Sequence, residues 1–329
     1  MNLDSILSPV KKHLALFDEK LKENLASDSA LISQVAQHLV NRRGKRLRPA
    51  MVFLSYGLCA DSKNHAQPTP AVMNVALAVE FIHTATLLHD DVIDQSKVRR
   101  GQVSVNHKWN NLVSVLMGDF LLAKSLRLLV ETESPTLLST ISKATVNLSI
   151  GEMSEAQESH NWDIDEDTYF KIISDKTASL FTASCEAGAV AAGANRKCQE
   201  SLREYGQNLG MAFQITDDLL DWVGETEKTG KGLGTDLKEG KITLPLIHTL
   251  RESDPRTQKK LIRLLENDFN QRDFDQILSV MKGNGGVEYA QDRASTFGEK
   301  AGNCISGFKD SRYRNSLQSL IGFVIHRDK

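Results

Sequence analysis

Residues 71–95 read AVMNVALAVEFIHTATLLHDDVIDQ, and this stretch decides the fold class. Its apolar side chains recur at 75, 78, 79, 82, 85, 88 and 92, which is close to the i, i+3, i+4, i+7 spacing of one helix face. Similar patterns recur at 112–131, 136–159, 168–192, 201–224, 241–251, 257–268 and 287–307. Runs that alternate apolar and polar residues are scarce. The sequence therefore predicts an all-α protein of ten or more helices.

Turn signals fall between these patterns, and no low-complexity linker marks a domain boundary. We therefore expect residues 1–329 to form a single all-helical domain. The longest irregular stretch, 224–240, is rich in Gly and Lys. Long loops of that kind are usually functional or mobile.

The composition argues against several classes of protein. The 329 residues carry 40 Lys+Arg and 42 Asp+Glu, so bulk electrostatic binding to nucleic acid or to an anionic membrane is not expected. Cys59, Cys185, Cys198 and Cys304 are far apart, which argues against a disulfide scaffold or a zinc site and fits a reducing, cytoplasmic setting. The N-terminus does not read as a signal peptide, and no 18 apolar residues run together, so we expect no transmembrane helix.

The most informative feature is a DDxxD motif that occurs twice, as DDVID at 90–94 and DDLLD at 217–221. Each copy ends an apolar helical run. On a helix, the first and last aspartates of each copy share one face, where like charges repel unless a cation lies between them. A solvated acidic helix end is the plain alternative, but two copies in the same context make it a poor explanation. The motifs therefore predict two metal-binding helix ends.

The chemistry of these ligands favours Mg²⁺. The motifs offer only oxygen ligands, and neither contains the 12-residue loop of an EF-hand. Mg²⁺ keeps several waters and is usually held by one or two carboxylates together with substrate phosphates. Two such clusters with Mg²⁺ between them would form a clamp for a diphosphate.

Basic residues near both motifs fit a diphosphate as well. Arg99 and Arg100 follow the first motif, Lys231 and Lys241 follow the second, and RRGKRLRP occupies 42–49. Taken alone, the last segment could equally be a solvated turn or a basic localisation signal. His83 lies two turns before the first motif on the same helix face, where a ligand and a core histidine are equally reasonable.

GKRLRP, HTATLLHDDVID with RRG after it, KTA, GMAFQITDDLLD and GKGLGTDLKEGKITLP follow one another in this order. Over about residues 40–250 they resemble the trans-isoprenyl (polyprenyl) diphosphate synthases. The C-terminal Arg327-Asp328-Lys329 resembles the long-chain bacterial members, octaprenyl diphosphate synthases in particular. The resemblance implies a transferase with a helical bundle around a central cavity, two or three Mg²⁺ per site, and a cytoplasmic homodimer. Its substrates would be isopentenyl diphosphate and an allylic diphosphate.

The resemblance also implies roles for single residues. Mg²⁺ on the allylic diphosphate would be bound by Asp90, Asp91 and Asp94, together with Asp217 and, more loosely, Asp221. Asp218, the middle member of the second motif, would belong to the catalytic set. That diphosphate would be contacted by Arg99, Lys176, Lys231 and Lys241. The diphosphate of isopentenyl diphosphate would be held by Lys45, Arg48, His83 and Arg100. Oxygen dipoles would be directed at the growing cation by Thr177 and Gln214.

Three positions depart from the pattern of this family. Asn110 stands where a Gly commonly follows Trp, Glu155 replaces a common Gln, and Arg43 replaces the first Gly of GGKR. We expect none of the three to touch a metal or phosphate ligand.

The product length implied by the resemblance depends on the helix that carries the first motif. Ala85 and Thr86, about one turn below Asp90, are both small, whereas short-chain members often carry an aromatic group at the position of Ala85. The first large ring is Phe81, roughly 13 Å below Asp90 at 1.5 Å per residue. We therefore expect a long all-trans product made from farnesyl diphosphate, C40 within a range of C30–C50. It would serve ubiquinone biosynthesis and pass to a membrane through a peripheral contact without stable insertion.

Three other functions remain open from the residues. The first is a shorter-chain synthase that makes geranylgeranyl or farnesyl diphosphate, against which Ala85 argues. The second is a non-catalytic subunit of a heteromeric synthase, which would be expected to lack one motif. The third is a regulatory protein that binds Mg²⁺ or phosphate. The apolar pattern at 112–130 also permits a helix-on-helix dimer.

Overall fold

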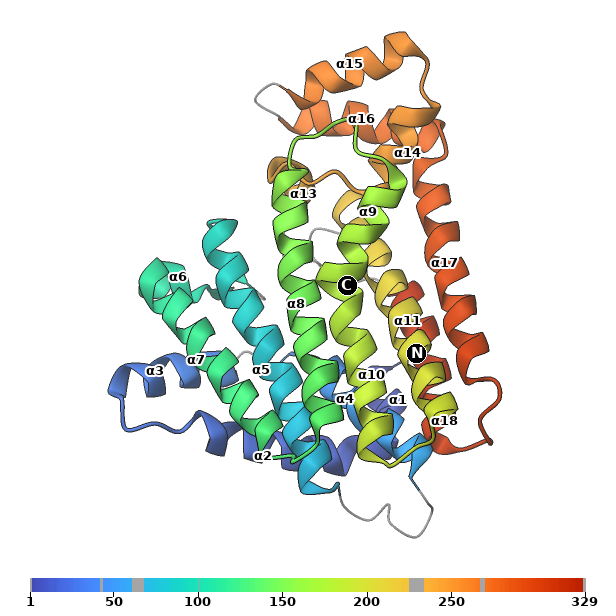
Figure 1. Cartoon of the computed structure of the whole chain (residues 1–329). Coiled ribbons are helices and arrows are strands. Elements are labelled where there is room, and N and C mark those ends of the chain that lie inside the picture. Colours follow the sequence, from blue (N-terminus) through green and yellow to red (C-terminus); the bar gives the residue numbers. More distant parts are fainter. Residues whose placement is uncertain are drawn as a thin grey trace. The chain divides into compact units, whose positions relative to one another are not determined.

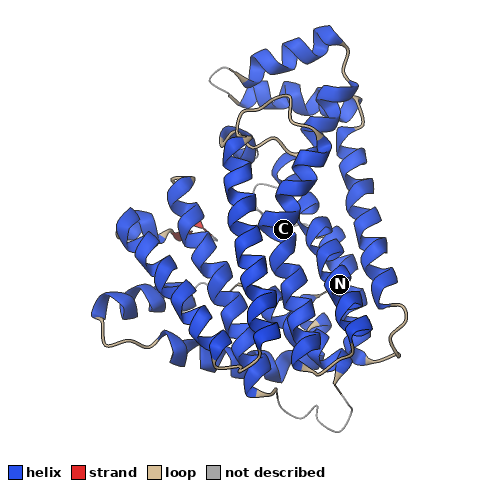
Figure 2. Cartoon of the chain, viewed as in Figure 1, coloured by secondary structure: helices blue, strands red, loops and turns tan. Residues whose placement is uncertain are grey.

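The structure is a computed structural model that describes residues 2–41, 44–60, 68–99, 101–224, 234–266 and 270–327. Helices make up nearly all of its regular structure, as predicted (Figure 2). In chain order the elements are α1 (Leu3–Ile6), η1 (Ser8–Val10), α2 (Lys11–Leu25), α3 (Ala30–Asn41), α4 (Leu47–Cys59), α5 (Pro70–Ile93), β1 (Val98–Arg99), β2 (Gln102–Val103), α6 (Val105–Lys108), α7 (Asn111–Val130), α8 (Pro135–Gln157), α9 (Glu166–Ile173), η2 (Ser174–Ala178), α10 (Ser179–Ala191), α11 (Arg196–Val223), α13 (Thr235–Lys238), α14 (Leu244–Glu252), α15 (Pro255–Leu265), α16 (Gln271–Gly283), α17 (Gly286–Ile305) and α18 (Arg312–Ile325).

Several predicted helices match the observed ones to within two residues at each end. The deciding stretch, 71–95, is α5, which begins at Pro70 because Thr69 caps it by accepting the amide of Val72. The pattern at 112–131 is α7, and the pattern at 136–159 is α8. The pattern at 168–192 is divided by η2, a π-helical turn. The helices α2, α3, α4, α16 and α18 were not among the predicted patterns.

Internal contacts divide the chain into two compact units. Unit 1 comprises residues 1–145, 180–206 and 304–320, and unit 2 comprises 146–179, 207–303 and 321–329. A unit that is compact by its internal contacts does not have to fold independently as a domain. The single domain over 1–329 therefore stays a prediction.

The core of unit 1 is built around α5, which lies alongside α7 (Figure 1). Gly118 on α7 allows a close approach, because a Cβ there would collide with the His89 ring. By length and composition α5 could cross a membrane, but 67% of its most apolar window is buried inside the molecule. This degree of burial is typical of a helix in the core of a folded protein.

The core of unit 2 surrounds the C-terminal part of α11. Trp222 stacks on Phe274 of α16, with ring centroids 5.4 Å apart. Its indole Nε1 donates to Thr243 Oγ1 at 2.9 Å, which satisfies the buried N–H just before α14. These contacts hold the last two turns of α11, where the second acidic motif lies.

Candidate functional site

The first acidic motif ends α5, as predicted. Asp94 is the C-cap residue, and its amide donates to the Asp90 carbonyl at 2.8 Å, so the helical path continues to the last aspartate. The first and last carboxylates therefore share a face. An acidic C-cap is unfavourable beside the negative end of the helix dipole, and a cation would offset that cost.

The middle aspartate of this motif lies in a different environment. Asp91 is 1% exposed, and Arg99 on β1 donates its Nε–H to it. The Asp91 carbonyl also accepts the Ser96 amide at 2.9 Å and the Asn106 side chain at 2.8 Å. Because a buried carboxylate is stable only when it is paired, Asp91 anchors the β1–β2 hairpin to the end of α5. Its share in metal binding, which the resemblance implies, stays a prediction.

The basic segment before α4 positions two further predicted residues. Arg46 adopts a left-handed backbone conformation (φ 50°, ψ 34°) and pairs with Glu80 and Asp18, so its charge is used inside the fold. Lys45, just before it, is exposed. Arg48, in the first turn of α4, has its Nη1 3.1 Å from His83 Nε2. A guanidinium can only donate, so this His83 nitrogen is the acceptor.

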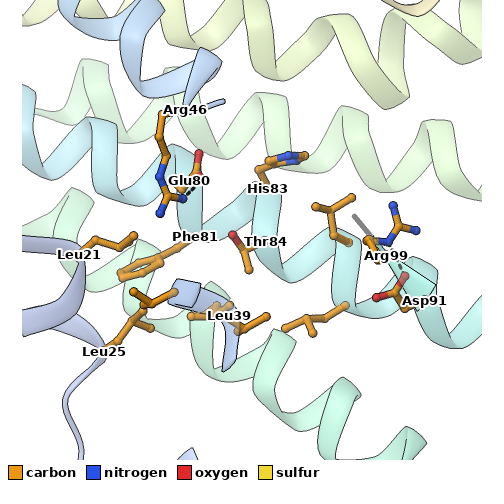
Figure 3. A pocket seen from close by; sticks show the side chains of 14 residues that line it. Leu21, Leu25, Leu39, Arg46, Glu80, Phe81, His83, Thr84, Asp91 and Arg99 are labelled. Carbon is orange, nitrogen blue, oxygen red and sulfur yellow. Dashed lines mark hydrogen bonds and ion pairs between the residues drawn. The ribbon is translucent and has the colours of Figure 1, made fainter. Parts of the chain in front are cut away.

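A pocket in unit 1 brings four predicted site residues together (Figure 3). One part of its wall is apolar and includes Leu21, Leu25 and Leu39. The rest of the lining holds two ion pairs, Arg46 with Glu80 and Arg99 with Asp91. The predicted residues in the lining are Phe81, His83, Asp91 and Arg99. Ala85, which is fully buried, and Thr86 are not part of this lining.

The three carboxylates of the second motif differ in their contacts. Asp217 is half exposed, and Arg327 Nη2 lies 2.8 Å from its Oδ1. Asp221 accepts the amides of Thr235 and Asp236 on its two oxygens, both at 3.1 Å, so it caps the N-terminus of α13. Among the three carboxylates of this motif, Asp217 is therefore the most accessible to a solvent-borne cation.

Asp218 is the buried middle member, as Asp91 is in the first motif. Tyr169 donates to its Oδ2 at 2.5 Å, and the Gln214 amide donates to its Oδ1 at 2.7 Å. Burial raises the pKa of Asp218 to about 7, although both hydrogen bonds act in the opposite direction. Gln214 Oε1 in turn accepts the Thr177 hydroxyl at 2.7 Å. Asp218 therefore fixes which end of the Gln214 amide points toward Thr177.

Lys176 and Thr177 lie in the π-helical turn η2, a rare geometry that is frequent at functional sites. Lys176 Nζ lies 2.7 Å from Glu152 and 2.6 Å from Glu155, both on α8. Lys241 lies 2.7 Å from Glu239 and 3.9 Å from the same Glu155. Burial raises the pKa of Glu152, and the Lys176 charge opposes that shift. Two lysines predicted to contact diphosphate thus share one acidic neighbour.

This arrangement corrects one expectation. Glu155, a departure from the family pattern, was expected not to touch a phosphate ligand, yet it pairs with Lys176. The sequence could not show this contact, because Glu155 and Lys176 are 21 positions apart in the chain and α9 lies between them in sequence. Asn110 caps α7 by accepting the amide of Val113, and the expectation that it touches no metal or phosphate ligand stays a prediction. Arg43, Arg100 and Lys231 lie outside the described residues.

Arg327 is the residue at these motifs that sequence reasoning missed. The C-terminal tail did enter the resemblance, but no role was assigned to its arginine. The contact with Asp217 spans 110 residues, so only the tertiary structure shows it.

The donor chemistry at both motifs fits a hard divalent cation. Carboxylate oxygens on one helix face suit Mg²⁺. Among the described residues, no group of three or more His, Cys, Asp or Glu side chains converges on one point. A complete protein cage is not required, because Mg²⁺ takes its remaining ligands from water and substrate phosphates.

A family model described as polyprenyl synthetase matches residues 29–281 of this chain. The chain belongs to the polyprenyl synthetase family. It is 36% identical to the all-trans-nonaprenyl-diphosphate synthase (geranyl-diphosphate specific) of Rhodobacter capsulatus, over 98% of this chain and 97% of that protein. It is 33% identical to the octaprenyl diphosphate synthase of Escherichia coli, over 100% of both. The crystal structure of a polyprenyl synthase from Caulobacter crescentus CB15, complexed with calcium and isoprenyl diphosphate, has a TM-score of 0.91 and 38% identity, covering 100% of this chain and 98% of that one.

This polyprenyl synthetase is therefore a prenyltransferase, a trans-prenyl diphosphate synthase of the long-chain type. Its family uses allylic diphosphates and isopentenyl diphosphate as substrates and depends on divalent metal. The fold expected from the resemblance, an all-helical isoprenoid synthase fold, is confirmed.

Proposed function

We propose that this enzyme elongates farnesyl diphosphate by successive head-to-tail condensations with isopentenyl diphosphate and releases an all-trans octaprenyl (C40) diphosphate. The observation that carries the proposal is the DDxxD motif at the C-terminal end of both α5 and α11. The printed names of two full-length relatives, a nonaprenyl and an octaprenyl synthase, support a long product.

Asp90 and Asp94 from α5, with Asp217 and Asp221 from α11, are proposed to hold two or three Mg²⁺ on the allylic diphosphate. When bound, Mg²⁺ neutralises the charge that develops on the diphosphate as the allylic C–O bond breaks. Asp221 already accepts two backbone amides, so we expect it to contribute less than Asp217.

The basic residues are proposed to bind the two diphosphates. Lys176 and Lys241 would exchange their carboxylate partners for the allylic diphosphate, joined by Arg99 and Lys231. Lys45, Arg48, His83 and Arg100 would hold isopentenyl diphosphate. Holding both substrates in line lowers the barrier to their condensation.

Thr177 and Gln214 are proposed to direct oxygen dipoles at the allylic cation. Gln214 is suited to this because Asp218 accepts a hydrogen bond from the Gln214 NH₂ group. The Gln214 carbonyl oxygen therefore points away from Asp218 and toward Thr177. The departing diphosphate is proposed to take the proton that the condensation releases, since no side chain is an obvious base. The apolar helices keep water from quenching the cation.

Product length is proposed to depend on α5. Thr86 lies one turn before Asp90 on the same face, while Ala85 and Phe81 are neighbours on another face. Ala85 is fully buried. An aromatic ring at this position would therefore fill space beside α5 and leave less room for the growing product. We expect Ala85→Phe or Ala85→Tyr to shorten the product. An unchanged product length in a folded variant would contradict this role for Ala85.

We further propose that two copies associate through α7, and that the enzyme works in the cytoplasm. The outer side of α7 exposes Leu112, Leu116, Leu126 and Val130, each more than half exposed. These four positions follow one helix face, which also carries the exposed Asp119. Exposed apolar side chains gathered on one face are typical of a protein interface. The product would pass to a membrane through a peripheral contact and supply a quinone side chain.

One assay tests the reaction. The protein is incubated with Mg²⁺, farnesyl diphosphate and labelled isopentenyl diphosphate, and the products are separated by chromatography. We expect a C40 product, and Asp90→Ala or Asp217→Ala to lower the rate by orders of magnitude with unchanged circular dichroism. A C15 or C20 product would favour a shorter-chain synthase. No product from the folded protein would favour a non-catalytic subunit or a regulatory protein.

A further inference from the structure

The C-terminal turn brings a cation to the second acidic motif. Arg327 lies just after α18 and folds against α11. Its Nη2 is 2.8 Å from Asp217 Oδ1 and 3.0 Å from the Phe213 carbonyl oxygen. Its guanidinium carbon lies 4.0 Å from the centre of the Phe213 ring. The arginine is thus held by three different contacts within about one turn of a single helix.

The side chain of this arginine is buried. Its side chain is 7% exposed, although its partner Asp217 is 55% exposed. Burying a guanidinium is costly unless its donors are paired, and within the described residues its Nε–H has no hydrogen-bond partner. The site therefore tolerates an incompletely paired buried cation, which suggests that the cation serves the neighbouring carboxylate.

We propose that Arg327 is a positioning residue that acts as the protein's own cation at the second motif, holding Asp217 when no metal is bound and giving way when Mg²⁺ binds. This rests on the proposed function, because it takes Asp217 as a metal ligand. The two cations compete for one oxygen. Mg²⁺ binds carboxylate oxygen at about 2.0–2.1 Å, and a guanidinium on that same oxygen would face strong like-charge repulsion.

The exchange requires little rearrangement. When Asp217 turns to a metal, Arg327 still has the Phe213 carbonyl and ring, so the end of α18 need not unfold. In the metal-free protein the pair offsets the repulsion between Asp217 and its acidic neighbours. Breaking the pair between Arg327 and Asp217 costs free energy, and this cost lowers the affinity of the site for metal. Because Asp217 is half exposed, we expect the cost to be modest.

Metal binding measures this competition directly. Mn²⁺ is titrated into the full-length protein with saturating inorganic diphosphate, and the free ion is followed by electron paramagnetic resonance. We expect Arg327→Gln to bind Mn²⁺ about three- to tenfold more tightly than the unchanged protein, as the loss of about 1 kcal/mol of competing interaction predicts. Arg327→Lys, which keeps the charge, should stay close to the unchanged protein. Arg256→Gln, at an exposed arginine in the first turn of α15, is the control for the change in net charge.

Equal or weaker Mn²⁺ binding by folded Arg327→Gln would overturn the proposal, as would an equal gain in Arg256→Gln. Asp217→Asn separates this failure from that of the proposed function. If the unchanged protein binds Mn²⁺ no better than Asp217→Asn, then Asp217 is not a metal ligand.

Discussion

The middle aspartate of each DDxxD motif acts differently from the aspartates that flank it. Asp91 pairs with Arg99, and Asp218 accepts from Tyr169 and Gln214. One step along a helix turns a side chain by about 100°, so the middle residue leaves the face of the first and last. The sequence correctly indicated which residues form each motif. It could not indicate the partners of the middle aspartate, which come from other elements.

At the same scale, Glu155 should weaken diphosphate binding, because it holds Lys176 and lies near Lys241. Replacing it by Gln keeps a hydrogen-bond acceptor and removes one negative charge. We expect Glu155→Gln to bind inorganic diphosphate about two- to tenfold more tightly by calorimetry, given the size of partly exposed ion pairs. Glu158→Gln, at a partly exposed position just after the same helix, should have little effect. Weaker binding by Glu155→Gln would show that the carboxylate supports the lysines instead of competing for them.

Cys185 should be an unreactive thiol. It is fully buried on α10, and burial raises its pKa to about 12 from an ordinary 9. Because the pKa is higher in the folded state, this thiol contributes stability that is fully present below about pH 9 and lost as pH rises through about 12. At pH 8 we expect iodoacetamide, followed by mass spectrometry, to label Cys185 only after unfolding in urea. Labelling within minutes in the folded protein would contradict its burial.

At the scale of helices, Gly151 on α8 brings that helix close to η2. A Cβ at this position would collide with the backbone of Lys176. The glycine therefore places Glu152 and Glu155 within ion-pair distance of Lys176. The helical pattern predicted α8 well, but it carried no signal for this crossing or for the π-helical turn, because both depend on the neighbouring helix.

This close approach predicts opposite effects for two glycine substitutions. Gly151→Ala should lower the free energy of unfolding by about 1–3 kcal/mol through overpacking. Gly322→Ala on α18 is the matched control, because no atom lies within 4 Å of a Cβ built there. It should be neutral or raise stability by up to about 1 kcal/mol, the usual gain of Ala over Gly in a helix. Thermal and urea unfolding measure both, and equal stabilities for the two variants would contradict the crossing.

At the scale of the whole molecule, the exposed stripe of α7 predicts self-association. Leu116→Glu introduces a charge into the stripe and should shift the protein toward monomer in sedimentation velocity experiments, because burying an unpaired carboxylate is costly. Leu31→Glu, at an exposed leucine on α3, should leave the association state unchanged. A folded Leu116→Glu variant that sediments like the unchanged protein would place the interface elsewhere.

The sequence by itself determined the helical class, the ends of α5 and α7 to within two residues, and the two acidic motifs. These follow from local rules, since helix periodicity and the chemistry of carboxylates depend on neighbouring residues in the chain. Only the tertiary structure decided that Asp91 and Asp218 are buried anchors, that Glu155 meets Lys176, and that Arg327 reaches Asp217. Each of these contacts joins residues from different elements. Local periodicity cannot specify such contacts, because they depend on how the helices pack.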